Sequence, residues 1–317
     1  MKPLTLFGPY GTRLEQKAAK HHFSYGDPTD ILGSAAVARA VGDIADEYLN
    51  AGARAITIPC FGARWSLHKH DGLKEYNKLT ERNFQIVLER LNNRSDITRD
   101  KVRILFCVGP KNDCYDPKDA PSIQESAEFH EKQIRQIDAL TRKYQTPVTA
   151  LFETLPSGEE AEGIAIALKK FHKGVTNAIL SYPFNYSGSP LGEETFLDII
   201  KRVDAHQNGL MISHGLNCGP IEGVAKVLNQ LGDKKKRVSI IYPNASSKPH
   251  AELNNVGVNH GVINSQETTA YLRYLSALAE LAVIGGCCGY DESNISDLSQ
   301  NNEVQVHTPP TDRLAAR

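Results

Sequence analysis

Residues 148–180 read VTALFETLPSGEEAEGIAIALKKFHKGVTNAIL, and this stretch contains the repeating unit of the chain. An apolar run at 148–152 precedes a segment at 159–171 in which apolar residues recur every three or four positions, and a second apolar run follows at 178–180. The runs indicate buried strands, and the segment between them indicates an amphipathic helix. Two strands joined by a helix of this length are expected to pair in parallel.

The same unit recurs along the whole 317-residue chain. Eight such units predict a (β/α)8 TIM barrel of the α/β class, and we expect a single domain over residues 1–317 with a polar tail from about residue 299. A doubly wound open sheet is the alternative architecture. The expected strands are 4–7, 55–58, 102–106, 148–152, 178–180, 209–212, 238–241 and 281–284, and the expected helices are 35–51, 84–91, 123–144, 159–171, 196–205, 221–231 and 270–280.

The residues with the most distinctive chemistry directly follow the expected strands. Glu153 comes after the fourth strand, Cys218 lies beyond the sixth, and Cys287 and Cys288 lie beyond the eighth. The carboxyl ends of barrel strands meet at one rim, which is where barrel enzymes have their active sites. We therefore expect these side chains to converge.

Three cysteines at one rim form the main candidate for a functional site. Adjacent cysteines such as Cys287 and Cys288 rarely bridge each other, because the disulfide ring is strained, but both can bind one metal ion. A catalytic zinc ion takes three protein ligands and keeps a further position open. Cys218, Cys287 and Cys288 therefore predict a zinc site that binds and activates a substrate sulfur.

The other cysteines and the nearest histidine are expected to have structural roles. We interpret Cys60, Cys107 and Cys114 as small buried hydrophobes. His214 lies four residues before Cys218, and strand alternation would place both on one face if the strand stays regular that far. We interpret His214 as a polar residue that lines the barrel, in preference to a fourth metal ligand.

Two further positions at the rim could contact a ligand. A carboxylate at a strand end can hold a substrate ammonium, and we prefer this role for Glu153 over that of a buried carboxylate satisfied by backbone N–H groups. Gly8 begins the segment Gly8-Pro9-Tyr10-Gly11, which we interpret as a tight turn that also lets the backbone approach a ligand.

The composition argues against several classes of function. The formal net charge is -1, with 40% hydrophobic and 23% charged residues, so we expect neither nucleic-acid nor membrane partners. Bilayer spanning needs ~20 apolar residues, and no segment has them. Six cysteines in so long a chain do not make a disulfide framework. Because no signal-peptide pattern is present, we expect a cytoplasmic protein.

The strand-end motifs resemble those of the homocysteine S-methyltransferase family. This zinc-dependent family includes S-methylmethionine- and betaine-dependent enzymes and the homocysteine module of cobalamin methionine synthase, and the chain is closest in size to the S-methylmethionine type. The matches run in the family's order over nearly the whole chain. The most specific are GLNC at 215–218 and GGCC at 285–288, with support from FETLP at 152–156, VGP at 108–110, IYPN at 241–244, GA at 52–53 and IT at 56–57.

This resemblance implies a (β/α)8 barrel and roles for individual residues. It implies that Glu153 binds the amino group of homocysteine, and that Gly8 and Asn217 complete the substrate-binding set. No catalytic side chain is expected beyond the zinc-bound substrate thiolate. The implied zinc ligands are Cys218, Cys287 and Cys288.

Phe7 departs from the family pattern. The family has an Asp-Gly pair after the first strand, with the Asp helping to bind the substrate amino acid, and this chain has Phe7-Gly8 there. We therefore predict weak use of homocysteine, and an improvement on Phe7→Asp if the side chain points into the pocket. The loop after the second strand also differs, with Pro59 and Cys60 where the family tends to have polar residues.

The predicted enzyme is a methyltransferase that moves a methyl group from a sulfonium or ammonium donor to the thiol of homocysteine, giving methionine. Its cofactor is Zn²⁺, and its partners are a small-molecule thiol and a methyl donor. A free thiol has a pKa of about 8.5 and is mostly protonated at neutral pH, and zinc removes that proton. Two alternatives stay open. One is methylation of another thiol or selenol, or corrinoid-linked methyl transfer, and the other is a zinc-binding barrel without catalysis that acts as a binding or regulatory protein.

Overall fold

The computed structural model describes residues 3–21, 34–171, 175, 177–207, 209–245 and 265–300. Within these residues, eight parallel strands form one sheet in the order β1-β8-β7-β6-β5-β4-β3-β2. A bridge between Leu6 and Ala55 joins the two edges of the sheet, which closes the barrel. The strands are β1 (Leu4–Thr5), β2 (Ala55–Pro59), β3 (Arg103–Val108), β4 (Thr149–Phe152), β5 (Asn177–Tyr182), β6 (Met211–Asn217), β7 (Val238–Tyr242) and β8 (Val283–Ile284).

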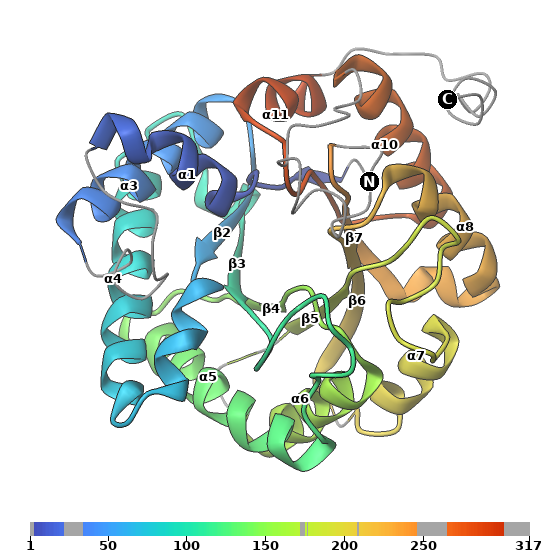
Figure 1. Cartoon of the computed structure of the whole chain (residues 1–317). Helices are drawn as coiled ribbons and strands as arrows, with labels where there is room; N and C mark the ends of the chain where they lie inside the picture. Colours follow the sequence, from blue (N-terminus) through green and yellow to red (C-terminus); the bar gives the residue numbers. More distant parts are fainter. Residues whose placement is uncertain are drawn as a thin grey trace.

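Helices form a ring around these strands (Figure 1). This arrangement confirms the predicted single (β/α)8 barrel and excludes the doubly wound open sheet. None of the helices in the described residues combines the length and the hydropathy needed to cross a membrane. The helices are α1 (Tyr10–His21), α3 (Ala35–Asn50), α4 (Gly72–Asn92), α5 (Ile123–Lys143), α6 (Gly158–Phe171), α7 (Phe196–Asp204), α8 (Ile221–Leu231), α10 (Ser265–Ala279) and α11 (Glu292–Ser299), with short 3₁₀ helices η1 (Gly62–His68), η2 (Arg99–Lys101) and η3 (Gly232–Arg237).

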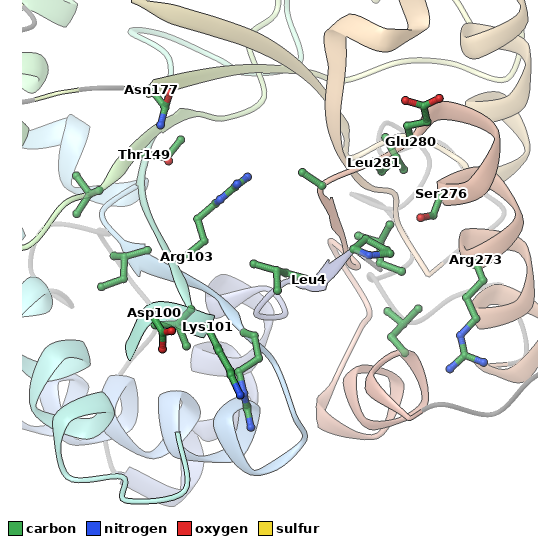
Figure 2. A pocket seen from close by; sticks show the side chains of 18 of the residues that line it. Leu4, Asp100, Lys101, Arg103, Thr149, Asn177, Arg273, Ser276, Glu280 and Leu281 are labelled. Carbon is green, nitrogen blue, oxygen red and sulfur yellow. The ribbon is translucent and has the colours of Figure 1, made fainter. Parts of the chain in front are cut away.

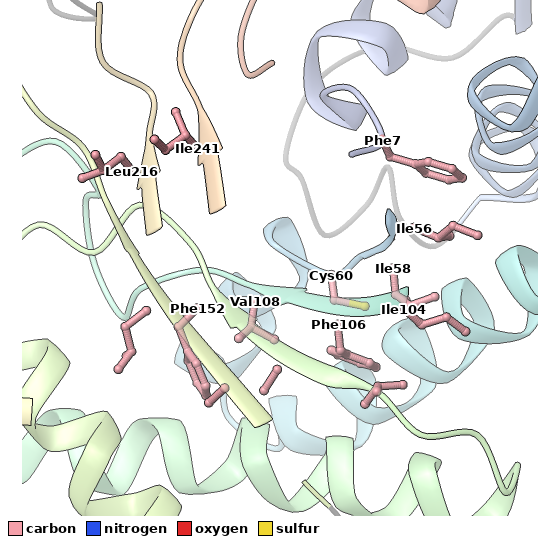
Figure 3. Close-up of a cluster of buried hydrophobic side chains, with 14 of the residues drawn as sticks. Phe7, Ile56, Ile58, Cys60, Ile104, Phe106, Val108, Phe152, Leu216 and Ile241 are labelled. Atoms are coloured by element: carbon pink, nitrogen blue, oxygen red, sulfur yellow. The ribbon is translucent and has the colours of Figure 1, made fainter. Parts of the chain in front are cut away.

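Strand alternation divides the apolar side chains between two cores. On β3, Leu105 and Cys107 belong to the cluster inside the barrel, whereas Phe106 and Val108 belong to the cluster between strands and helices. Figure 3 shows part of the second cluster, in which side chains from several strands meet the surrounding helices. The fold is therefore stabilised by a large apolar core on both faces of the sheet.

Three differences from the predicted elements matter for the site. The chain after β1 is not a tight turn, because α1 already begins at Tyr10. Strand β6 ends at Asn217 and not at Ile212, and α4 begins at Gly72, well before residue 84. The predicted polar tail beyond residue 300 lies outside the described residues.

Two cavities lie at opposite ends of the barrel. The larger, of about 1380 Å³, is lined by the first residues of strands, including Arg103, Thr149 and Asn177 (Figure 2). The smaller, of about 350 Å³, is lined by residues that follow the strands, including Glu153 and Cys287. Barrel enzymes have their active sites at the carboxyl ends of the strands, so position identifies the smaller cavity as the candidate site despite its size.

Candidate metal centre

Three cysteine sulfur atoms converge in the wall of the smaller cavity. The sulfur atoms of Cys218, Cys287 and Cys288 all lie within 4.8 Å of one another, and all three residues line the cavity. The thiols of Cys218 and Cys287 are buried, and Cys288 is partly exposed. The structure thus brings together the three residues that the sequence predicts as metal ligands.

The donor set and spacing fit a soft divalent ion such as zinc. Zn–S bonds of about 2.3 Å in a tetrahedron place sulfur atoms ~3.8 Å apart. Cys218 and Cys287 have sulfur atoms 2.6 Å apart, so these two would have to separate by ~1.2 Å to bind a zinc ion. Other residues of the described chain add no fourth histidine, cysteine or carboxylate to the cluster, which leaves a coordination position for a substrate.

Hydrogen bonds among the three thiols distribute their protons unequally. The pKa of Cys288 is well below its usual value, because Cys218 and then Cys287 donate hydrogen bonds to it. The pKa of Cys287 is well above its usual value, because of its hydrogen bonds with Cys218 and Cys288 and its burial. Binding of a divalent ion would release the protons that these thiols carry.

Backbone conformation directs Cys218 into the barrel and separates it from His214. Cys218 has a φ of +50°, in the left-handed region, directly after the end of β6. This turn interrupts the alternation along the strand. Cys218 consequently belongs to the cluster inside the barrel, whereas His214 stacks on Tyr182, which belongs to the cluster between strands and helices.

His214 is therefore not part of the metal centre. Its Nδ1 lies 3.1 Å from the hydroxyl of Tyr182, and burial, together with Arg237, lowers its pKa to about 3. His214 lies outside the cysteine cluster, and these contacts agree with its interpretation as a structural residue. Its expected place inside the barrel is wrong, because the strand turns before it reaches Cys218.

The glycines before the cysteine pair leave no room for a side chain. The backbone N–H of Cys287 donates to the carbonyl of Pro243 at 2.7 Å, which ties the loop to the segment after β7. A Cβ on Gly286 would lie 1.9 Å from Cγ of Tyr290, whose ring is 2% exposed. The Gly-Gly pair therefore permits the close packing that positions both cysteines.

We expect Gly286→Ala to weaken metal binding by displacing the cysteine loop. A group forced into a filled space typically costs about 1–3 kcal/mol of stability, and misplaced ligands bind a metal less well. Metal affinity, measured by competition with a chelator, should fall at least ~10-fold. Losses of this size are typical when the groups that orient metal ligands are disturbed. Gly192→Ala is the matched control, because its nearest contact would be 3.6 Å away. Equal metal affinity in the two variants would contradict this account.

Glu153 lies in the same cavity and is the carboxylate that the sequence predicts. It follows β4 and lines the cavity, and its Oε2 accepts a hydrogen bond from the thiol of Cys107 at 2.8 Å. Burial raises its pKa to about 7, and the nearby Cys218 adds to this effect. A cationic group in the cavity would favour the carboxylate form. Cys107 is buried as predicted, but it also orients Glu153.

Asn217 and Gly8 occupy different positions relative to the cavity. Asn217 is fully buried, accepts a hydrogen bond from Ser181 and donates one to Thr154, both at 2.7 Å. These bonds hold the ends of β4, β5 and β6 together beside Cys218. Gly8 lines the cavity, and a Cβ there would meet the hydroxyl of Tyr48 at 2.5 Å. Direct contact of either residue with a substrate stays a prediction.

Phe7 borders the cavity, but its ring faces the helices. The ring packs against Tyr48 and Tyr10, with centroid distances of 5.5 and 6.2 Å, and is 1% exposed. Figure 3 shows it on the same side of the sheet as Ile56 and Ile58, facing the helices. The condition for a gain on Phe7→Asp, an inward side chain, is therefore not met.

Several residues that line the cavity have no signal in the sequence. Arg64 and Trp65 reach it from η1, and Tyr115 reaches it from the loop after β3. None belongs to a recognisable motif, and only the folded chain shows that they border the cysteines.

The chain combines a parallel barrel with three cysteines at its carboxyl-terminal rim. The family model for homocysteine S-methyltransferase matches residues 4–301. The chain therefore belongs to this family and is a methyltransferase. The family acts on the thiol of homocysteine.

Solved structures share the fold at low sequence identity. The homocysteine methyltransferase MmuM from Escherichia coli, in its metallated form, matches with a TM-score of 0.71 and 17% identity, covering 94% of this chain and 96% of that one. Its oxidised form matches with a TM-score of 0.70 and 18% identity, covering 94% and 95%. A search of curated protein sequences finds no significant match.

Proposed function

We propose that this chain is a zinc-dependent enzyme that transfers a methyl group from a sulfonium or ammonium donor to the thiol of homocysteine, giving methionine. The observation that carries the proposal is the convergence of three thiols within 4.8 Å beside Glu153, in one cavity. A volume of about 350 Å³ suits amino-acid-sized reactants.

Metal and protein make different contributions to this reaction. Zinc held by Cys218, Cys287 and Cys288 would offer an open position and keep a substrate thiol in its nucleophilic form. The protein itself positions the reactants. Glu153 would hold the substrate ammonium, which would orient the sulfur for in-line attack on the methyl carbon. The donor loses its positive charge in the transition state, so orienting the donor matters more than stabilising that charge.

A screen of metal-loaded protein tests the proposal. Homocysteine, or another thiol or selenol in its place, is offered with S-methylmethionine, glycine betaine or a methylated corrinoid as donor, and the methylated product is measured. Methionine formation with S-methylmethionine or glycine betaine supports the proposal, whereas formation with the methylated corrinoid alone favours corrinoid-linked methyl transfer. Methylation of another thiol or selenol in place of homocysteine would favour the first alternative, and metal binding without any turnover would favour a binding or regulatory barrel.

We expect Glu153→Gln to weaken homocysteine binding while the metal is retained. A hydrogen bond between charged partners contributes ~1.5–3 kcal/mol, so the dissociation constant should rise roughly 10- to 100-fold. Calorimetric titration of metal-loaded protein measures this change. Glu159→Gln, at an exposed position on α6, is the control. If Glu153→Gln binds homocysteine as tightly as the wild type does, Glu153 does not contact the substrate.

A further inference from the structure

Arg64 is a buried cation in the wall of the active-site cavity. Its side chain lines the cavity and is 4% exposed, and burial lowers its pKa. Among the residues that the structure describes, no carboxylate forms an ion pair with it. A charge withdrawn from water without a partner is costly, so this position is suited to an anionic ligand.

Neighbouring groups hold the guanidinium in one orientation. Its Cζ lies 4.2 Å from the ring centroid of Phe61 and 4.3 Å from that of Trp65. Nη1 donates to the carbonyl of Phe61 at 3.0 Å, and a Cβ on Gly109 would lie 2.8 Å from Cδ of Arg64. Nε has no hydrogen-bond partner in the described chain. A planar donor group fixed in this way matches the geometry of a carboxylate.

Arg64 and Glu153 present opposite charges to the same cavity. Both residues line this cavity, Glu153 directly after β4 and Arg64 on η1. An α-amino acid carries an ammonium and a carboxylate on the same carbon atom. A carboxylate and a guanidinium that border one small cavity are complementary to this pair of groups.

We infer that Arg64 binds the carboxylate of the thiol acceptor while Glu153 binds its ammonium, so that the cavity selects thiols with an α-amino-acid head group. This inference rests on the proposed function, because it assumes that the acceptor sulfur lies at the cysteines. It assigns recognition of the acceptor's head group to one residue from η1 and one from the end of β4.

Three thiol compounds test the two charged groups of the amino-acid head group separately. Homocysteine carries both, 4-mercaptobutyrate lacks the ammonium, and 3-mercaptopropylamine lacks the carboxylate. Each is titrated calorimetrically into metal-loaded protein without a methyl donor, so that binding is measured without turnover. The variants are Arg64→Gln, Arg64→Lys and Glu153→Gln. Arg135→Gln is the matched control, because its guanidinium also stacks on an aromatic ring, that of Phe171, at 4.2 Å but on the exposed surface.

Arg64→Gln should raise the dissociation constants of homocysteine and 4-mercaptobutyrate roughly 10- to 100-fold and leave that of 3-mercaptopropylamine nearly unchanged. Glu153→Gln should instead raise the dissociation constant of 3-mercaptopropylamine and leave that of 4-mercaptobutyrate nearly unchanged. Arg64→Lys should recover part of the lost affinity, because it keeps the charge but not the planar donor edge.

The inference is overturned if Arg64→Gln weakens the binding of all three thiols equally, or if it changes only the KM of the methyl donor. If Arg64→Gln does not fold, the wild type decides, because equal affinity for homocysteine and 3-mercaptopropylamine would exclude a carboxylate contact. Failure of the proposed function has a different signature. The three thiols would then bind with the predicted pattern, and no donor would yield methionine.

Discussion

Alanine in place of Cys218, Cys287 or Cys288 is expected to remove the bound metal and to abolish methyl transfer while the barrel stays folded. Loss of a group that merely supports a metal ligand costs ~10–100-fold in affinity, so loss of a ligand itself should cost more. The fold should persist because apolar side chains fill both faces of the sheet, and a protein of this size does not depend on a metal for its core.

Cys60→Ala is the matched control for these variants. Cys60 also follows a strand near the rim, but it belongs to the helix-facing cluster with Ile58 and Phe106 (Figure 3). Its replacement should cost ~0.5–3 kcal/mol of stability and leave the metal content at about one ion per chain. Metal analysis and thermal unfolding measure the two effects separately. Full metal retention in the Cys287→Ala and Cys288→Ala variants would exclude this centre.

Phe7→Asp is expected to destabilise the protein strongly and not to improve homocysteine use. The substitution removes a ring that packs on Tyr10 and Tyr48 and places a carboxylate in the same apolar surroundings. Loss of a buried Phe typically costs ~3–5 kcal/mol, and an uncompensated buried charge costs a comparable amount. The midpoint of denaturant unfolding should therefore fall markedly.

Phe7→Leu provides the comparison, because it keeps an apolar side chain and should cost much less. Kinetics of both variants complete the test. If Phe7→Asp were as stable as the wild type and had a lower KM for homocysteine, its carboxylate would reach the cavity, and the outward position of residue 7 would not describe the working enzyme.

The barrel and the three cysteines could be predicted from the sequence because both depend on short-range patterns. Each strand is an apolar run, and a parallel barrel places the carboxyl ends of all strands at one rim. Cys218 and the pair at 287–288 therefore converge without any knowledge of side-chain geometry. Glu153 follows from the same reasoning, since it directly follows β4.

The features that the sequence does not predict depend on local backbone conformation and on long-range packing. Helix α1 was not predicted, because Gly8, Pro9 and Gly11 are typical of turns. The sequence predicts too early an end for β6, because Ser213, His214 and Asn217 make the second half of the strand polar. The positive φ of Cys218 cannot be inferred from the alternation of side chains along a strand.

Arg64 is the clearest case of a site residue that has no sequence signal. An arginine in a loop is ordinarily solvated, and only the folded chain stacks it between Phe61 and Trp65 in the cavity wall. The same holds for Phe7. Its position in the sequence invites a pocket role, but its ring packs against residues from α1 and α3.

The central claim is that the three-cysteine centre carries out methyl transfer to homocysteine, and its most direct test measures turnover against zinc occupancy. Metal-free protein is titrated with zinc from zero to one equivalent per chain, with homocysteine and a donor whose methyl group is deuterated. Labelled methionine should form at a rate proportional to the zinc bound, and Cys288→Ala should form none. Turnover that is equal in metal-free and zinc-loaded protein, or no labelled methionine at full occupancy with any sulfonium, ammonium or corrinoid donor, would contradict the account.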